Sequence, residues 1–508
     1  MHLNRCDLFA VLLAMQHHLP TRGHHLKPSF LCRLILITAA LLQSAQAATL
    51  NLDLPDIGDT AGGTISPAEE RKFGEAFMRQ IRQSLKVMDD TEITEYMRSL
   101  GYQLAANSDN QSLDFSFFVV ADNDVNAFAG PGGFIGVNSG LILATESESE
   151  LASVLAHEIG HVTQRHIARR FEQVDKLSIP ATAALLAAII IGSRNSELGQ
   201  AALATAQAGS AQIQINFTRA NEEEADRVGL QTLARGGFDP RSMPVFFERL
   251  QKASRFAGAS APEFLRTHPV TESRIADTRN RAEQYPYRQI SDDLNYHLIR
   301  AKLRVMKEGT PKQAVVRFAA ALKSGQYRNQ AAERYGYALA LFANGDYATA
   351  RNELRTLQAA DKERIAYIDA LARVDLADDQ SPRALRSYEE ALKLFPGNPV
   401  LTLGYSRALL HTGQADKARR LLQEYVRRQA PDPALYKLLA DAEIAAGQKA
   451  AAHQALAEYY YLNGQTIAAI EQLQSGIKAS DADFYRASQM EARLKEVQDQ
   501  AAQEATHR

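Results

Sequence analysis

The sequence predicts an α+β fold that is mainly α-helical, in which a domain with a small sheet precedes an all-α solenoid of repeats. Three observations indicate this fold. Strand-like runs occur only before about residue 140, residues 151–162 have the composition of a buried helix, and small residues recur every 34 positions in the second half. Because the patterning becomes wholly helical near Pro286, we place the first domain at 48–288 and the repeats at 289–508.

The overall composition is that of a globular protein. A chain of 508 residues has room for about two to four domains. Its 45% hydrophobic and 23% charged residues exclude a disordered chain and a multi-span membrane protein. The 57 basic and 59 acidic residues give a net charge of −2, without a block of five like charges. Because nonspecific binding to nucleic acid depends on excess basic charge, we expect no nucleic-acid partner.

Residues 1–47 have the features of a secretory signal peptide. Basic residues precede the apolar run Leu34–Leu42, which is too short to span a bilayer, and a small-x-small cleavage motif ends at Ala47. Both cysteines of the chain lie in this segment, so we expect the exported protein to have no disulfide bond. An N-terminal anchor is the alternative, and either Met1 or Met15 is the true start.

The first domain begins with helical periodicity at 67–85 and contains two strand candidates. The first is 113–121, and the second lies between glycines and comprises Phe134, Ile135, Gly136 and Val137. At the edge of a sheet, this second strand would bind an extended substrate as a further strand. A strand in the core of the sheet is the alternative.

A buried helix at Leu151–Val162 contains three residues that need a partner. Most of its residues are apolar, yet it includes His157, Glu158 and His161, which are unfavourable to bury unless something satisfies them. The two histidines are four residues apart, so both rings lie on one face of the helix and can bind a single Zn²⁺ at about 2.0–2.1 Å. Glu158 is then offset to a position beside the metal, where it can take a proton from a water molecule.

The helical segment 220–233 supplies a third ligand, which a catalytic zinc site needs. Glu222 and Asp226 are four residues apart, on a stripe that continues through apolar Leu230. We predict Glu222 as the third zinc ligand and Asp226 as a catalytic-site residue that orients a ligand histidine, with His157 the expected one. Taken alone, the acidic run is typical of a solvated helix face, but the buried histidine helix favours the zinc site.

Two apolar segments follow the predicted metal helix. Residues 179–191 are too short to span a membrane, and residues 201–211 are rich in alanine. Together they either form a lid or membrane-touching hairpin over the cleft, or pack between the two domains. Peripheral contact with a membrane is therefore one of two expectations for this region.

The second domain contains a helix-turn-helix repeat of 34 residues. Four alanines mark its register, and a turn residue lies five positions before each: Ala350, Ala384, Ala418 and Ala452, with Gly345, Asp379, Gly413 and Gly447. The period and the small residues where helices cross resemble the tetratricopeptide repeat, although Asp379 departs from the turn glycine. An alanine-rich bundle is the alternative. Repeats of this kind present a curved surface for protein or peptide ligands.

Several segments of the first domain resemble, in order, one superfamily of zinc metallopeptidases. They are DVNAFAGPGG at 124–133, ELASVLAHEIGHVTQRH at 150–166, NEEEADRVG at 221–229, GFDP at 237–240 and THPVTESRI at 267–275. This superfamily includes the prenyl-protein endopeptidase, the heat-shock membrane protease and the mitochondrial inner-membrane stress protease. With its signal peptide and repeats, the chain is similar to the branch that serves β-barrel assembly in the Gram-negative periplasm.

The resemblance implies roles for two further residues. In that family the histidine that matches His268 lies on a loop over the active site and occupies the open position of the zinc, which keeps the enzyme latent until the loop moves. Asn126 matches the family's NAF segment and is a candidate for substrate binding, with no role that its own chemistry indicates. We expect His166 to be a solvated helix residue without a function.

The resemblance also implies a periplasmic zinc endopeptidase with one Zn²⁺ per chain, associated with the outer membrane. Its implied substrates are unfolded or misassembled outer-membrane proteins, and the implied partner of the repeats is the β-barrel assembly machinery. One alternative is a chaperone or assembly scaffold with a mostly latent protease site. Another is a zinc hydrolase of non-peptide amides, which protein-binding repeats disfavour.

Overall fold

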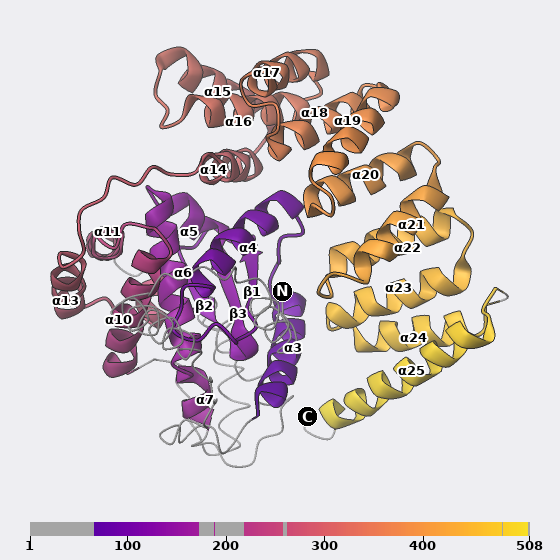
Figure 1. Cartoon of the computed structure of the whole chain (residues 1–508), viewed down its shortest axis with the longest axis horizontal. Coiled ribbons are helices and arrows are strands. Elements are labelled where there is room, and N and C mark those ends of the chain that lie inside the picture. Colours follow the sequence, from indigo (N-terminus) through magenta and orange to yellow (C-terminus); the bar gives the residue numbers. More distant parts are fainter. Residues whose placement is uncertain (1–65, 172–186, 188–217, 258–261, 480, 506–508) are drawn as a thin grey trace, which may run out of the picture. The chain divides into compact units, whose positions relative to one another are not determined.

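The computed structural model describes residues 66–171, 187, 218–257, 262–479 and 481–505 (Figure 1). The predictions for residues 1–47 and 201–211, and for all of 179–191 except Ala187, lie outside the described residues. Within the described part of the chain, no helix is both long enough and apolar enough to cross a membrane.

Two helices open the described chain, and each begins at a residue that caps its free N–H groups. Helix α3 spans Pro67–Ser84, and Ser66 exchanges hydrogen bonds with the glutamate three residues further on. Helix α4 spans Thr91–Ala105, and the carboxylate of Asp90 accepts a hydrogen bond from the third N–H of the helix. The predicted first helix is confirmed.

A three-stranded sheet follows, in the spatial order β1-β3-β2. Its strands are β1 at Ser116–Val120, β2 at Ala127–Ala129 and β3 at Phe134–Asn138. Strand β3 pairs parallel with β1 and antiparallel with β2. The chain turns from β2 to β3 through the short helix η2 at Pro131–Gly133, where Gly133 has a φ of 76° and a side chain would collide with the backbone of Asp114.

The expectation of an edge strand at Phe134, Ile135, Gly136 and Val137 is wrong. These residues form most of β3, which is the central strand and is buried along its whole length. Both backbone edges of β3 are already paired, so it has no free edge for a substrate, and the alternative of a core strand is confirmed. Strand β2 lies at an edge of the sheet instead.

Helices surround this sheet and complete the first domain. They are α5 at Ser139–Ala144, α6 at Glu148–Thr163, α7 at His166–Phe171, α10 at Arg219–Arg235, α11 at Ser242–Ala257, α12 at Glu263–Thr267 and α13 at Glu272–Ala282. Helix α6 contains the predicted metal-binding histidines, and every residue from its first to Val162 is buried. It packs against α4, α10, α11 and β2.

Two glycines let α6 and α10 approach each other closely. A side chain at Gly160 on α6 would place its Cβ 2.9 Å from the backbone oxygen of Ala225 on α10. A side chain at Gly229 on α10 would lie 3.1 Å from the backbone of Ala156 on α6. Because neither position has a side chain, polar residues of both helices can meet in the core.

The remaining helices form the predicted repeats. They are α14 at Leu294–Lys307, α15 at Pro311–Ser324, α16 at Gln330–Ala343, α17 at Tyr347–Ala360, α18 at Ile365–Ala377, α19 at Ser381–Leu394, α20 at Pro399–His411, α21 at Ala415–Val426, α22 at Pro433–Ala445, α23 at Lys449–Leu462, α24 at Thr466–Ile477 and α25 at Phe484–Ala505. The four register alanines are buried, and all four turn residues have positive φ angles, including Asp379 at 55°. The helix-turn-helix period is confirmed.

Helix α14 belongs to two hydrophobic cores at once. Tyr296 and Ile299 pack in the core around α6, whereas Leu298 and Ala301 pack in the core of the first repeats. On the same helix, Nζ of Lys302 is buried and donates hydrogen bonds to Asp90 at 2.8 Å and to Glu92 at 2.7 Å. The start of the repeats is therefore packed into the first domain rather than tethered to it. The boundary at 288/289 stays a prediction.

Candidate metal centre

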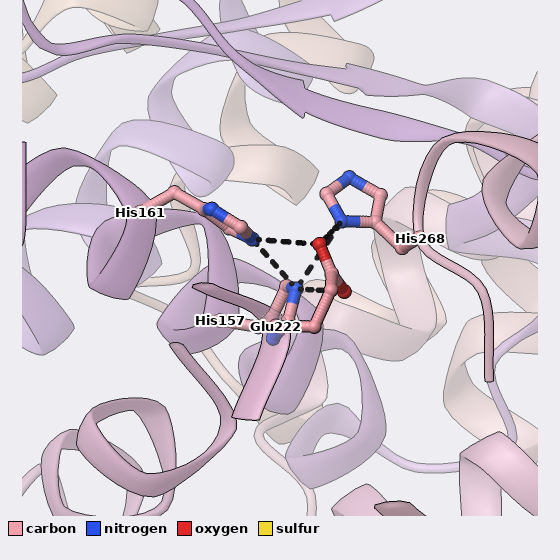
Figure 2. A group of neighbouring side chains, drawn as sticks. All are labelled: His157, His161, Glu222 and His268. Atoms are coloured by element: carbon pink, nitrogen blue, oxygen red, sulfur yellow. Dashed lines mark hydrogen bonds and ion pairs between the residues drawn. The ribbon is translucent and has the colours of Figure 1, made fainter. Parts of the chain in front are cut away.

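Four side chains from three helices converge at the centre of the first domain. His157 and His161 lie on α6, Glu222 lies in the first turn of α10, and His268 is the C-cap residue immediately after α12. Their possible ligand atoms all lie within 4.8 Å of one another, and all four residues are buried (Figure 2). The structure thus brings the three predicted zinc ligands together with the predicted occupant of the fourth position.

The spacing of these atoms fits one small cation. Nε2 of His157 lies 3.0 Å from Nε2 of His161 and 3.5 Å from Oε2 of Glu222, and Nε2 of His161 lies 3.4 Å from Oε1 of Glu222. Nδ1 of His268 lies 3.3 Å from Nε2 of His157 and 3.0 Å from Oε1 of Glu222. Ligand atoms about 2.0–2.1 Å from a tetrahedral zinc ion lie roughly 3.4 Å apart. Both the donor types and their separations therefore fit a single metal cation of this size.

Glu158 lies beside the converging donors. It follows His157 on α6 and is fully buried, and its Oε1 lies 3.5 Å from Nε2 of His268. Burial raises the pKa of Glu158, although the neighbouring imidazoles oppose the shift. A carboxyl group with a raised pKa is suited both to take up a proton and to return it. This is the position and the chemistry that the general-base hypothesis requires.

The ionisable groups of the centre shift one another's pKa values. Burial lowers the pKa of His157, but the carboxylates of Asp226 and Glu222 outweigh burial and raise it to about 10. Burial lowers the pKa of His161 well below its usual value. Burial would raise the pKa of Glu222, yet the surrounding imidazoles hold it well below its usual range. The pocket thus favours an ionised Glu222 and a neutral His161, which are the forms that bind a metal cation, whereas a bound cation has to displace the proton that the raised pKa gives His157.

Comparisons with known proteins identify the family. Residues 92–282 match peptidase family M48, and residues 375–442 match a tetratricopeptide repeat family. The β-barrel assembly-enhancing protease of Escherichia coli (strain K12) is 35% identical over 444 residues, which are 87% of this chain and 91% of the relative. The chain belongs to the β-barrel assembly-enhancing proteases.

Two further relatives agree with this assignment. The putative β-barrel assembly-enhancing protease of Vibrio cholerae is 37% identical over 418 residues, 82% of this chain and 86% of the relative. The mitochondrial metalloendopeptidase OMA1 of Arabidopsis thaliana is 29% identical over 220 residues, 43% of this chain and 42% of the relative. The chain is therefore a metalloendopeptidase of the M48 family with tetratricopeptide repeats, as its residues and its resemblance predicted.

An arginine that the sequence analysis missed supports the centre. Asp226 lies 2.9 Å from Nδ1 of His157, and the buried guanidinium of Arg274 donates two hydrogen bonds to Asp226, at 2.7 and 2.8 Å. Nη1 of Arg274 lies 2.7 Å from Oε2 of Glu222 and donates to the carbonyl of Pro269 at 2.8 Å. One arginine thus links the carboxylates of α10 to the loop after His268. Arg274 lies in the THPVTESRI segment, which is the signal that could have indicated it.

A second correction concerns His166, which is not a solvated helix residue. Only 3% of it is exposed, and its Nδ1 lies 3.0 Å from Nδ1 of His161. Its other ring nitrogen lies 3.1 Å from Oε2 of Glu224 on α10. The chain turns sharply between α6 and α7, and this turn, which helical periodicity does not encode, brings His166 back toward the centre.

Asn126 is buried immediately before β2, with 1% of its surface exposed. Its carbonyl accepts a hydrogen bond from the N–H of Asn138, and the preceding carbonyl, that of Val125, accepts one from the N–H of Phe264 on α12. The segment therefore joins the sheet to α12, the helix immediately before His268. A direct role of Asn126 in substrate binding stays a prediction.

Proposed function

We propose that this chain is a periplasmic zinc-dependent endopeptidase that degrades misassembled outer-membrane proteins and assists the assembly of others. The observation that carries the proposal is the convergence of His157, His161 and Glu222 at the separations of zinc ligands. The family supports it, because the relatives that match most of the chain are named for enhancing β-barrel assembly. We expect one Zn²⁺ per chain.

In the proposed mechanism, His157, His161 and Glu222 hold the ion. When bound, zinc supplies a Lewis acid that acidifies a water molecule and polarises the scissile carbonyl. Glu158 takes the proton of the attacking water and later delivers it to the leaving amine. Oδ1 of Asp226 lies 2.9 Å from Nδ1 of His157, and this contact keeps Nε2 of that ring directed at the converging donors.

His268 gives the site a closed state. Its Nδ1 is as close to His157 and Glu222 as those donors are to each other, so it would be a fourth ligand of a bound zinc ion and would take the place of water or substrate. We assign it the role of a latch, which must move with the end of α12 before cleavage. The edge of β2 that no strand of the described residues pairs with, next to α6, then offers backbone groups to an extended substrate.

The repeats and the N-terminal segment supply targeting in this proposal. The tetratricopeptide repeats offer a surface for protein ligands, to which we assign either the unfolded substrate or the β-barrel assembly machinery. The signal-peptide features of residues 1–47 support export to the periplasm. Association with the outer membrane is part of the same proposal and follows from the substrates.

Metal analysis and cleavage of casein by the purified chain from Ala48 onward test the proposal. We expect one zinc per chain, no cleavage with retained zinc in Glu158→Gln, and faster cleavage in His268→Ala. His411→Ala is the matched control, because it removes an exposed histidine from a repeat helix. Wild-type protein that binds no zinc would refute the metal site, and cleavage by Glu158→Gln would refute the general-base role.

The second candidate function is a chaperone or assembly scaffold with a mostly latent protease site. The burial of His268 within ligand distance of the centre favours it, since a closed site does not cleave. Suppression of the aggregation of an unfolded outer-membrane protein distinguishes the two. If Glu158→Gln suppresses aggregation as well as the wild type, and His268→Ala does not cleave, the scaffold function is the main one.

A further inference from the structure

The contacts of His166 are not explained by the proposed chemistry. Its Nδ1 lies 3.0 Å from Nδ1 of His161, with the two ring planes 75° apart, and its Nε2 lies 3.1 Å from Oε2 of Glu224. The side chain of Glu224 is 31% exposed, whereas those of both histidines are fully buried. Three side chains therefore form a line from a proposed zinc ligand to the surface of the domain.

We infer that His166, held by Glu224, is a positioning residue that orients His161 for the metal. The inference rests on the proposed zinc site. A ligand histidine binds through one ring nitrogen and donates the proton of the other to an acceptor, which fixes the tautomer and the ring orientation. Nε2 of His161 faces the converging donors, so its Nδ1 carries the proton and donates it to Nδ1 of His166. Nε2 of His166 then carries a proton of its own and donates it to Glu224.

The local backbone is arranged to create this contact. On an uninterrupted helix, a residue five positions after His161 would lie about 140° around the helix axis and face elsewhere. Helix α6 instead ends at Thr163, and Arg165 adopts a φ of 52°, a left-handed conformation that is unfavourable for a residue with a side chain. Helix α7 then begins at His166 with its ring turned toward His161. The unfavourable conformation of Arg165 thus lets the chain bury the imidazole of His166 against His161, a proposed ligand.

The two proposed histidine ligands then have separate supports. Nδ1 of His157 faces Asp226, which the buried Arg274 holds in place. Nδ1 of His161 faces a second imidazole, whose own partner is a partly exposed carboxylate. Because Glu224 lies on α10, like Glu222 and Asp226, this second support also fixes α10 relative to the end of α6.

Zinc dissociation constants of the mature full-length chain, measured by competition with a chromophoric chelator, test the inference. We expect His166→Ala to bind zinc about 10- to 100-fold more weakly, as is typical when the partner of a ligand histidine is removed. His166→Asn should recover most of the affinity, because its amide oxygen lies where Nδ1 lies and accepts the same hydrogen bond. Glu224→Ala should fall between these two variants. Glu223→Ala, which removes an exposed glutamate one position away on the same helix, should bind like the wild type.

The outcomes separate this inference from the proposed function. A wild-type chain that binds no zinc overturns both. Equal zinc affinity in wild type and His166→Ala overturns the positioning role alone and leaves the zinc site intact. A merely structural role predicts a lower melting temperature of zinc-free His166→Ala and no recovery of zinc affinity in His166→Asn. If His166→Ala does not fold, Glu224→Ala decides, and the inference is wrong if its affinity equals that of Glu223→Ala.

Discussion

A methyl group at Gly160 would disturb the metal centre without touching any proposed ligand. In Gly160→Ala, the new Cβ would lie 2.9 Å from the backbone oxygen of Ala225, where ordinary contacts begin at 3.4 Å. Helix α10 must therefore move away from α6 by about 0.5 Å at this point, since neither backbone can yield alone. Glu222 lies on α10 one turn before Ala225, so it moves away from His157 and His161.

Two opposing contributions set the change in the free energy of unfolding in Gly160→Ala: the cost of overpacking and the gain in helix propensity. Overpacking of a core costs about 1–3 kcal/mol, whereas replacing glycine by alanine inside a helix stabilises by about 1 kcal/mol. The free energy of unfolding of the zinc-free protein should therefore fall by at most about 2 kcal/mol. Zinc binding must pull Glu222 back and restore the clash, so the zinc affinity should fall by about 5- to 150-fold.

The assay is the zinc dissociation constant by chelator competition, together with the thermal melting temperature of zinc-free protein. Gly309→Ala is the matched control, because its new methyl would meet the end of one flexible glutamine side chain. We expect the control to leave both quantities unchanged. Wild-type zinc affinity in Gly160→Ala would show that the close approach of α6 and α10 does not determine the geometry of the centre.

Three further changes test other parts of the structure. Arg274→Met leaves two buried carboxylates without the guanidinium between them, and should lower the free energy of unfolding of zinc-free protein by about 3–5 kcal/mol in denaturant titrations. Lys302→Met removes the buried ammonium that joins Asp90 and Glu92 to the first repeats, and should lower it by about 2–4 kcal/mol in the same assay. A chain that ends at Tyr285 lacks α14, and should melt at a lower temperature than the full chain although it keeps every proposed site residue.

Exposed residues on the same helices supply control variants for the two substitutions. Arg279→Met removes an exposed arginine from the same helix as Arg274, and Lys307→Met removes an exposed lysine from the same helix as Lys302. If either core variant is as stable as its control, the corresponding buried ion pair contributes nothing to stability. A shortened chain with the melting temperature of the full chain would show that the core around α6 does not need α14.

The first repeat helices contact α4, which in turn packs against the helix of the metal centre. The buried contacts of Lys302 connect α14 to the start of α4, and α4 packs against α6, which carries the proposed histidine ligands. Tyr335 on α16 donates a hydrogen bond to Glu92 at 2.9 Å, so the repeats contact the same end of α4. A protein bound to the first repeats therefore lies two packed helices away from the metal centre.

The sequence by itself determined the proposed metal ligands and the repeats. His157 with His161, and Glu222 with Asp226, are pairs four residues apart, and the helical period places such pairs on one face whatever lies opposite. The buried composition of α6 then indicated that these faces meet in a core. The repeat period acts in the same way, because small residues mark the positions where neighbouring helices cross.

Only the tertiary structure decided which segments meet across the core. The position of β3 at the centre of the sheet depends on parallel pairing with β1, a long-range contact that a local pattern of glycines and apolar residues does not specify. His166 lies against His161 because one residue, Arg165, takes a left-handed conformation, and Arg274 reaches Asp226 across a gap of 48 residues in the chain. Helical periodicity assigns a residue to a face of its own helix, whereas the identity of the neighbour on that face is decided by packing of the whole chain.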